Sequence, residues 1–143
     1  MEPCLDIDAF ILAGGASRRM GTDKSQLLID DQTFIDRIAE TLSNVTDSVA
    51  IVGRSIDGSL DASSLRVVPD IYPQWGALGG LHAALSASSR EWAIVVACDL
   101  PFVTSELFFH LANMRLDHDA VVPVQEEGRP QPLAALYRVE PCR

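Results

Sequence analysis

The sequence predicts an α/β fold, in which a doubly wound, mostly parallel sheet carries helices on both faces. Short apolar runs alternate along the chain with segments whose apolar residues recur at helical spacing, which is typical of strand–helix units. The run Trp92–Ala97 is almost wholly apolar, as expected of a strand that is covered on both sides. The chain has 143 residues, 48% of them hydrophobic and 22% charged, so we expect one domain over 1–143.

The first half of the chain contains three predicted strands and one predicted helix. The strands occupy residues 9–12, 48–52 and 65–68, and a shorter extended piece occupies 27–29. Thr33 can cap the helix that follows, and Asp36, three residues further on, forms a weaker relative of the capping box. The apolar residues of this helix fall on one face: Phe34, Ile35, Ile38 and Leu42.

The second half of the chain continues the alternation. Residues 70–76 form a loop, and a helix then runs from about residue 76 to Ala87. The strand 92–97 follows, and Thr104 caps a helix that runs to about Met114. The inward residues of this helix are Leu107, Phe108 and Leu111. Two further strands, 120–124 and 132–137, are expected around the polar tip Glu126-Glu127-Gly128.

A glycine-rich, basic loop follows the first predicted strand. Gly14 and Gly15 allow positive φ angles and let backbone N–H groups approach a ligand closely. Arg18, Arg19 and Lys24 follow, in a chain with only 11 Lys and Arg against 20 Asp and Glu. A basic cluster beside a glycine loop in an acidic protein favours a polyphosphate site. The spacing excludes a P-loop, and the dinucleotide fingerprint G-x-G-x-x-G is absent.

Two aspartates also follow predicted strands. Asp70 comes after the strand 65–68, and Asp99 comes after 92–97. In doubly wound sheets the ligand crevice lies beyond the carboxyl ends of the strands, so we expect both carboxylates to lie on the same edge as the glycine loop. At the end of a buried strand a carboxylate is costly unless it is paired or holds a metal, although Asp99 could also simply cap the turn before Pro101.

The glycine loop resembles the L-A-G-G-x-x-x-R-M-G-x-D-K motif of the molybdenum cofactor guanylyltransferase family. The matching residues are Leu12, Ala13, Gly14, Gly15, Arg19, Met20, Gly21, Asp23 and Lys24. Three other segments resemble family motifs as well: Cys98–Phe102 (C-D-x-P-[FY]), Asp70–Gly80 (D-x-x-x-x-x-G-P-L-A-G, with Ala77 in place of Pro) and Gly128–Tyr137 (G-x-x-Q-P-L-x-A-L-Y). The resemblance covers nearly all of the chain and implies a Rossmann-like nucleotidyltransferase fold.

The resemblance implies a Mg²⁺-dependent enzyme that transfers GMP from GTP to the terminal phosphate of molybdenum-bound molybdopterin and releases pyrophosphate. It assigns Arg19, Lys24 and Asp99 to catalysis, with Asp99 as the Mg²⁺ ligand. The nucleotide-binding residues it implies are Leu12, Ala13, Gly14, Gly15, Lys24, Asp70 and Asp99, and those for the acceptor are Arg19, Gly21, Gly76 and Gly80. Gly79 and Gly80 are explained equally well by tight helix packing.

Two departures from the family pattern affect these expectations. Gly53 stands where many relatives carry an Asn that touches the nucleotide. The sequence also ends at Arg143, whereas the family usually continues through an N-x-N-T-P motif. We therefore expect one nucleotidyltransferase domain without the family's C-terminal stretch. We expect this chain to bind GTP with Mg²⁺ but to transfer GMP to molybdopterin poorly or not at all.

Other readings of the same residues stay open. The donor could be CTP, or the acceptor another small phosphorylated molecule such as a phospholactate. The chain could also be a nucleotide-binding module that has lost catalysis. A third alternative is a sugar-1-phosphate nucleotidyltransferase, a class that shares the glycine–Arg–Lys loop but usually has a longer chain. The formal net charge of −9 argues against nucleic acid as a partner. The sequence has no apolar run long enough to span a membrane and its 3 cysteines show no disulfide or metal spacing, so we expect a cytoplasmic protein.

Replacing Lys24 tests the phosphate assignment of the basic loop. Lys24→Ala should weaken GTP binding and slow transfer. The expected loss of transition-state stabilisation is about 2–4 kcal/mol, the scale of one preorganised group that stabilises developing charge. The circular dichroism spectrum should be unchanged. A variant that binds GTP and turns over like the parent would contradict the assignment.

Overall fold

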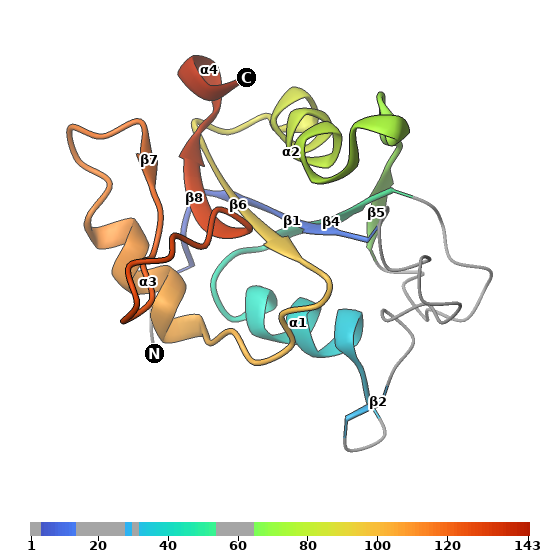
Figure 1. Cartoon of the computed structure of the whole chain (residues 1–143), viewed down its shortest axis with the longest axis horizontal. Helices are drawn as coiled ribbons and strands as arrows, with labels where there is room; N and C mark the ends of the chain where they lie inside the picture. The colour runs from blue at the N-terminus through green and yellow to red at the C-terminus, as the bar shows by residue number, and fades with distance from the viewer. Residues whose placement is uncertain (1–3, 14–27, 30–31, 54–64) are drawn as a thin grey trace.

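The computed structural model describes residues 4–13, 28–29, 32–53 and 65–143, and all structural statements below refer to these residues. They form a six-stranded sheet between two layers of helices, with α2 and α4 on one face and α1 and α3 on the other (Figure 1). The predicted fold class, a doubly wound and mostly parallel sheet with helices on both faces, is therefore confirmed.

The main sheet and its helices have the following bounds. The strands are β1 (Asp8–Leu12), β4 (Ser48–Val52), β5 (Arg66–Val68), β6 (Trp92–Ala97), β7 (Ala120–Val121) and β8 (Ala134–Arg138). The helices are α1 (Phe34–Ser43), the 3-10 turn η4 (Pro73–Trp75), α2 (Gly76–Ala87), α3 (Ser105–Asn113) and α4 (Val139–Cys142). A separate two-stranded ribbon pairs β2 (Leu28–Ile29) with β3 (Gln32–Thr33).

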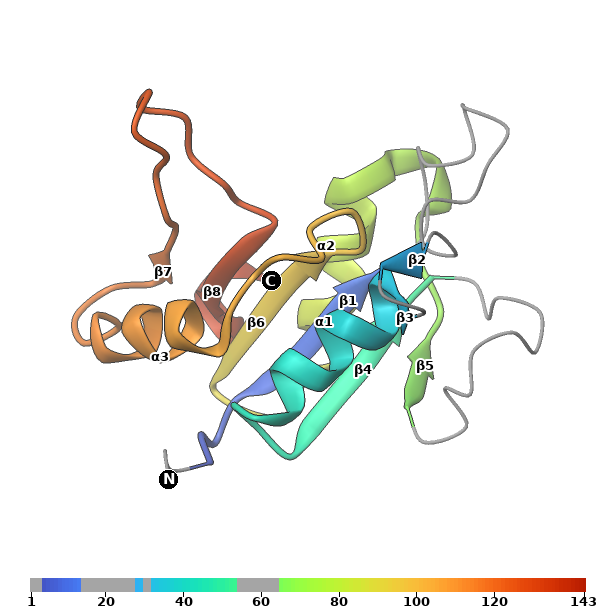
Figure 2. The same ribbon diagram turned by 90° about the horizontal axis from the view of Figure 1, so that it is seen from below.

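Strand β1 lies near the centre of the sheet, whose order is β5-β4-β1-β6-β8-β7. The strands β5, β4, β1 and β6 are parallel to one another, whereas β8 runs antiparallel to β6 and β7 antiparallel to β8. Leu12 lies opposite both Val52 and Ala97, and Val52 lies opposite Val68. The four parallel strands therefore end at one level, and Figure 2 shows β1, β4 and β6 side by side.

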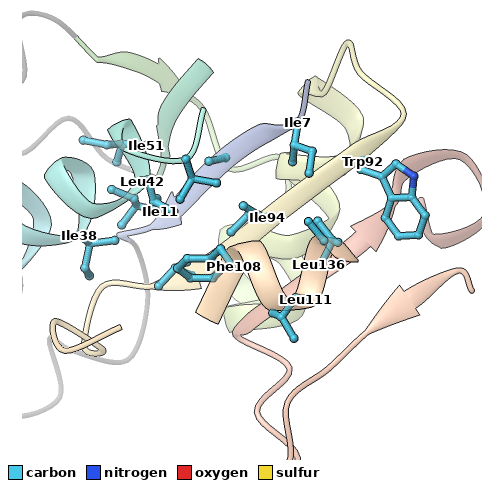
Figure 3. Packing of buried hydrophobic residues seen from close by; sticks show 14 of the residues in the cluster. Ile7, Ile11, Ile38, Leu42, Ile51, Trp92, Ile94, Phe108, Leu111 and Leu136 are labelled. Atoms are coloured by element: carbon cyan, nitrogen blue, oxygen red, sulfur yellow. The ribbon is translucent and has the colours of Figure 1, made fainter. Parts of the chain in front are cut away.

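The core has two halves because both faces of the central strands are covered. All five residues of β1 are buried, and they alternate between the halves. Ala9 and Ile11 belong to the cluster under α1 and α3, whereas Phe10 and Leu12 belong to the cluster under α2. Figure 3 shows the first cluster, in which Phe108 of α3 and Ile38 of α1 lie against the sheet.

The predicted elements agree closely with the observed ones where local signals are strong. The strands 48–52 and 92–97 have the predicted bounds. Both predicted caps form, since Thr33 Oγ1 accepts from the Asp36 N–H at 3.0 Å and Thr104 Oγ1 accepts from the Leu107 N–H at 3.3 Å. The predicted loop 70–76 contains the 3-10 turn η4.

The predicted strand 120–124 is shorter than expected. Ladder pairing stops after Val121, and Val124 contributes only a single bridge to Pro130. Pro123 and Pro130 have no N–H to donate to a ladder, which interrupts regular pairing. Gly128, with φ +82°, closes the tip.

A buried carboxylate at the amino ends of the strands was not predicted from the sequence. Asp8 is 2% exposed. Its carboxylate accepts hydrogen bonds from the hydroxyls of Ser48 (2.5 Å) and Ser88 (2.7 Å) and from the N–H groups of Ser89 (2.8 Å) and Arg90 (3.1 Å). These donors begin β4 and form the connection that enters β6, so one carboxylate ties together the starts of β1, β4 and β6.

The guanidinium of Arg90 completes this network. It donates to the Ile7 carbonyl and to Thr46 Oγ1, and it pairs with Asp47 at 2.8 Å and with Asp6 at 3.1 Å. Burial alone would raise the pKa of Asp8, but the four hydrogen bonds to its carboxylate lower the pKa below its ordinary value of 3.8. The charged form of Asp8 is therefore the one that stabilises the fold.

Asp8 and Asp6 form a matched pair of carboxylates beside the same arginine. Asp8→Ala should lower the free energy of unfolding by about 2–4 kcal/mol, because it leaves four partly buried donors without their acceptor. It also removes the carboxylate that lies 3.8 Å from Nε of Arg90, whose side chain is 25% exposed. The Asp6 side chain is 94% exposed, and Asp6→Ala should cost about 0–1 kcal/mol. Urea unfolding of both variants measures this, and equal losses would contradict the role of Asp8.

The same contribution should depend on pH. Because the folded pKa of Asp8 is lowered, its stabilisation is fully present above the unfolded value of 3.8 and is lost as the pH falls through the folded pKa. The difference in unfolding free energy between the parent and Asp8→Ala should thus be constant from about pH 7 to 5 and shrink well below pH 4. A difference that grows on acidification would have the wrong sign.

Candidate functional site

The candidate site lies at the carboxyl ends of the four parallel strands. Backbone pairing continues just past the strand ends: the Ala13 N–H donates to the Val52 carbonyl at 2.9 Å, the Cys98 N–H to the Leu12 carbonyl at 3.1 Å and the Gly53 N–H to the Val68 carbonyl at 2.9 Å. These bonds hold the first residue of each connection in register. A ligand that binds to the connections after β1, β4 and β6 is therefore positioned by one edge of the sheet.

Six of the predicted site residues belong to the described part of the chain: Leu12, Ala13, Asp70, Gly76, Gly80 and Asp99. The others, Gly14, Gly15, Arg19, Gly21 and Lys24, lie outside the described residues. In the strand order, β5 and β6 are three steps apart, which at the usual spacing separates their ends by about 14 Å. Asp70 and Asp99 thus follow strands on either side of β1, and each serves a different part of the edge.

Leu12 and Ala13 are buried at the end of β1, and their side chains pack into the two core clusters. A Cβ added to Gly80 would lie 3.4 Å from the δ carbons of Leu12, so this side chain faces α2. The side chains of Leu12 and Ala13 are therefore occupied by packing. What this segment can offer a ligand is chiefly its backbone.

Asp99 is exposed on a tight turn after β6. The strand ends at Ala97, and the Leu100 N–H donates to the Ala97 carbonyl at 3.2 Å, which turns the chain outward before Pro101. The expected cost of burying this carboxylate therefore does not arise. Among the described residues no side chain or backbone group is hydrogen-bonded or paired with it, and no three His, Cys, Asp or Glu side chains of this part converge on a metal position.

This arrangement fits Mg²⁺ in one particular way. Mg²⁺ is held by one or two carboxylates, completed by waters and substrate phosphates, and it does not need a cage of protein ligands. A single exposed carboxylate such as Asp99 can supply one such ligand on the described part of the edge. The donor set thus suits an ion that arrives with a polyphosphate.

An apolar cleft adjoins Asp99. It has a volume of about 380 Å³ and lies between the connection that leads from β6 into α3 and the hairpin between β7 and β8. Its lining residues are Asp99, Leu100, Pro101, Phe102, Val103, Thr104, Leu107, Pro123, Gln131 and Ala134. Two of the segments singled out in the sequence, Cys98–Phe102 and Gly128–Tyr137, therefore meet around one cavity.

Asp70 and the glycines after it form the other side of the edge. Asp70 Oδ1 accepts from the Tyr72 N–H at 3.0 Å, so this carboxylate organises the turn after β5. A Cβ on Gly79 would lie 2.3 Å from the Tyr72 carbonyl oxygen, and Gly76 has φ +58°. Gly79 is thus required for η4 to pack against α2, and Gly76 for the backbone that joins them.

Two aromatic residues on this side were not singled out from the sequence. The rings of Tyr72 and Trp75 are stacked, with centroids 4.2 Å apart and planes 15° apart. Their spacing of three residues, directly after Asp70, is the signal that could have identified them. The network around Asp8, by contrast, lies at the opposite edge of the sheet and has a structural role.

The sequence is similar to that of known nucleotidyltransferases. Residues 9–143 match the family described as MobA-like NTP transferase domain. A "probable molybdenum cofactor guanylyltransferase" from Methanothermobacter thermautotrophicus is 39% identical over 137 residues, which are 89% of this chain and 68% of the relative. A molybdenum cofactor guanylyltransferase from Desulfosudis oleivorans is 35% identical over 133 residues, 92% of this chain and 65% of the relative. The chain spans about two thirds of the length of these curated relatives.

A solved structure is similar as well. Molybdopterin-guanine dinucleotide biosynthesis protein A from Archaeoglobus fulgidus superposes with a TM-score of 0.74 at 27% sequence identity, covering 95% of this chain and 69% of that chain. In the part of the chain that the structure describes, no helix is long and apolar enough to cross a membrane.

Two adjacent glycines allow packing to be separated from ligand binding. Gly79→Ala should destabilise the protein by about 1–3 kcal/mol, because the new methyl group would overlap the Tyr72 carbonyl. Gly80→Ala makes only ordinary contact with Leu12 and gains helix propensity, so its unfolding free energy should stay within about 1 kcal/mol of the parent. Thermal and urea unfolding compare the two.

Activity of the stable Gly80→Ala variant then tests its assignment to the acceptor. If Gly80 lies against the acceptor, the variant should lose transfer while keeping its stability. Parent-like transfer would make Gly80 a packing residue. Equal destabilisation by the two substitutions would contradict the packing argument.

Proposed function

Since this chain belongs to the MobA-like NTP transferase family, we propose that it transfers GMP from GTP to the terminal phosphate of molybdenum-bound molybdopterin and releases pyrophosphate. The names of the relatives that are 35–39% identical support this reaction within the family. We also propose that the protein is cytoplasmic, where GTP is available.

The observation that carries the proposal is the common level at which four parallel strands end. Strand β1 leads into the glycine and basic segment, and the connections with Asp70 and Asp99 begin on either side of it. An edge of this kind suits an extended ligand better than a compact one, because its candidate groups are spread over about 14 Å. A nucleoside triphosphate facing a phosphorylated acceptor is an extended pair of substrates.

The proposed chemistry requires alignment more than proton transfer. A phosphate nucleophile is already anionic at neutral pH, so the reaction needs no general base, and we assign no catalytic role to a histidine. Arg19 and Lys24 would neutralise charge that develops on the transferred phosphate. The segment Leu12-Ala13-Gly14 would lie beside the guanine and ribose, with Asp70 nearby.

Mg²⁺ is the proposed cofactor, and Asp99 would hold it. When bound, the ion would neutralise phosphate charge and orient the polyphosphate for in-line displacement. The role of Asp99 is to supply an anionic oxygen at a fixed point of the edge. Its exposure on the turn after β6 leaves that oxygen accessible.

One observation weakens the case for strict selection of GTP over a second donor, CTP. Gly53, directly after β4, has φ +114°, a conformation that disfavours side chains. It therefore offers a nucleotide no side chain there. Base selection could therefore be weaker than in relatives with an Asn at this place. A panel of GTP, CTP, ATP and UTP, each with and without Mg²⁺, decides this by thermal shift.

A nucleotide at ~100 times its dissociation constant should stabilise the protein by about 2.7 kcal/mol. We expect the largest shift with GTP and Mg²⁺. The sequence predicts that GMP transfer to molybdopterin is weak or absent, and a single-turnover measurement on the same preparation tests this. A larger shift with CTP would select the alternative donor. Binding of GTP without transfer would leave a nucleotide-binding module, and absence of any shift would overturn the donor site.

Removing the charge of Asp99 tests the metal assignment. Asp99→Asn should abolish the Mg²⁺ dependence of turnover. It should also lower kcat/KM by an amount that corresponds to about 2–4 kcal/mol of lost transition-state stabilisation. Because Asp99 is exposed, Tm in the absence of metal should change little. Asp117→Asn is a matched control, since Asp117 is exposed near the amino end of β6 and its φ of +64° suits Asn. Identical Mg²⁺ titrations of Asp99→Asn and the parent would reduce Asp99 to a turn residue.

A further inference from the structure

Trp75 is an exposed aromatic residue at the candidate site. It is 54% exposed, whereas the chain's other tryptophan, Trp92, is 8% exposed in the core. One face of Trp75 is covered by the nearly parallel ring of Tyr72. The pair therefore presents an indole surface to solvent at the carboxyl edge, next to the turn that Asp70 organises.

The aromatic pair is held rigidly. The Trp75 N–H donates to the Tyr72 carbonyl at 2.9 Å, and the Tyr72 N–H donates to Asp70 at 3.0 Å. Gly79 brings the backbone of α2 directly onto the Tyr72 carbonyl. His82 also packs against Tyr72, with ring centroids 5.5 Å apart. A ring that stacked on Trp75 would therefore meet a surface that is already ordered, so little further side-chain entropy would be lost.

The surroundings suit a flat ring attached to phosphates. From Ile71 to Ser89 the sequence contains no Asp, Glu, Lys or Arg, although the chain carries a net charge of −9. The carboxylate next to this segment is that of Asp70, whose Oδ1 accepts the Tyr72 N–H. Flat rings stack on indole through dispersion and offset π contacts, with an energy that does not need hydrogen-bond partners.

We propose that Trp75, backed by Tyr72, stacks on the fused 2-amino-4-oxopyrimidine ring of a substrate, the ring system that guanine and pterins share. This inference rests on the proposed function, because that function brings both guanine and a pterin to this edge. It adds a binding residue that the family motifs do not include. Stacking supplies affinity for the ring, and the phosphates are held elsewhere.

Calorimetric titration with three probes separates the ring from the phosphates. Mg²⁺–GTP carries guanine and phosphates, neopterin carries the pterin without phosphate, and Mg²⁺–tripolyphosphate carries phosphates alone. Trp75→Ala should weaken binding of the ring that stacks there by about 5- to 100-fold, and Trp75→Phe should retain most of the affinity. Binding of tripolyphosphate should be the same in parent and both variants.

Leu116→Ala serves as the control for loss of exposed apolar surface. Leu116 is 80% exposed and lies beside Glu91 and Trp92 at the opposite end of β6. All three ligands should bind this variant as they bind the parent. Circular dichroism and Tm of Trp75→Phe show whether η4 and α2 stay folded if Trp75→Ala does not.

Fluorescence gives a second readout that a structural role would not produce. In Trp92→Phe the only tryptophan is Trp75, and its emission should be quenched by the stacking ligand and shielded from acrylamide. If Trp75→Ala loses affinity for GTP, guanine is the ring that stacks on Trp75. If it loses affinity for neopterin, the pterin is that ring. The inference is wrong, while the proposed function stands, if two results are found together. Both GTP and neopterin bind Trp75→Ala as tightly as the parent, and neither changes the Trp75 emission of Trp92→Phe. If the parent binds neither GTP nor tripolyphosphate, the proposed function fails first.

Discussion

The register of the parallel strands depends on one buried carboxylate. Asp8 joins the first residue of β4 to the connection that enters β6, and it does so at the amino ends of the strands. A slip of one residue would break these hydrogen bonds and exchange the side chains that β1 packs into the two core clusters. Because strands rise by a fixed length per residue, fixing their starts also fixes the level of their ends. The hydrogen bonds of Asp8 at the amino edge therefore also align the carboxyl ends of β1, β4 and β6, where the candidate site lies.

The aligned edge divides into two sides with different character. On the side of β5, a turn organised by Asp70 and a packing requirement at Gly79 hold an aromatic surface in place. On the side of β6, exposed Asp99 borders an apolar cleft under the hairpin between β7 and β8. Strand β1 lies between them. Under the proposed function, the donor would span β1, because Asp70 and Asp99, both assigned to the nucleotide, follow strands on opposite sides of it. Gly76 and Gly80, assigned to the acceptor, lie on the side of β5.

The sequence predicts this fold well where signals are local. Trp92–Ala97 is recognisable because a strand buried on both faces needs no polar residue, and Thr33 and Thr104 are recognisable as caps by their neighbours. The role of Asp8 was missed because Ser48 and Ser88 lie 40 and 80 residues away. The exposure of Asp99 was missed because it depends on the turn after Ala97. Roles assigned to Arg19 and Lys24 stay predictions from the family resemblance.

Amide hydrogen exchange with and without Mg²⁺–GTP tests the central claim, that the donor nucleotide binds at the carboxyl edge. The account predicts slower exchange in the connections that follow β5 and β6, at residues 70–80 and 98–103. Exchange should be unchanged at the amino edge, at residues 88–91 and 115–119. Protection confined to the amino edge, or none at saturating Mg²⁺–GTP, would contradict it.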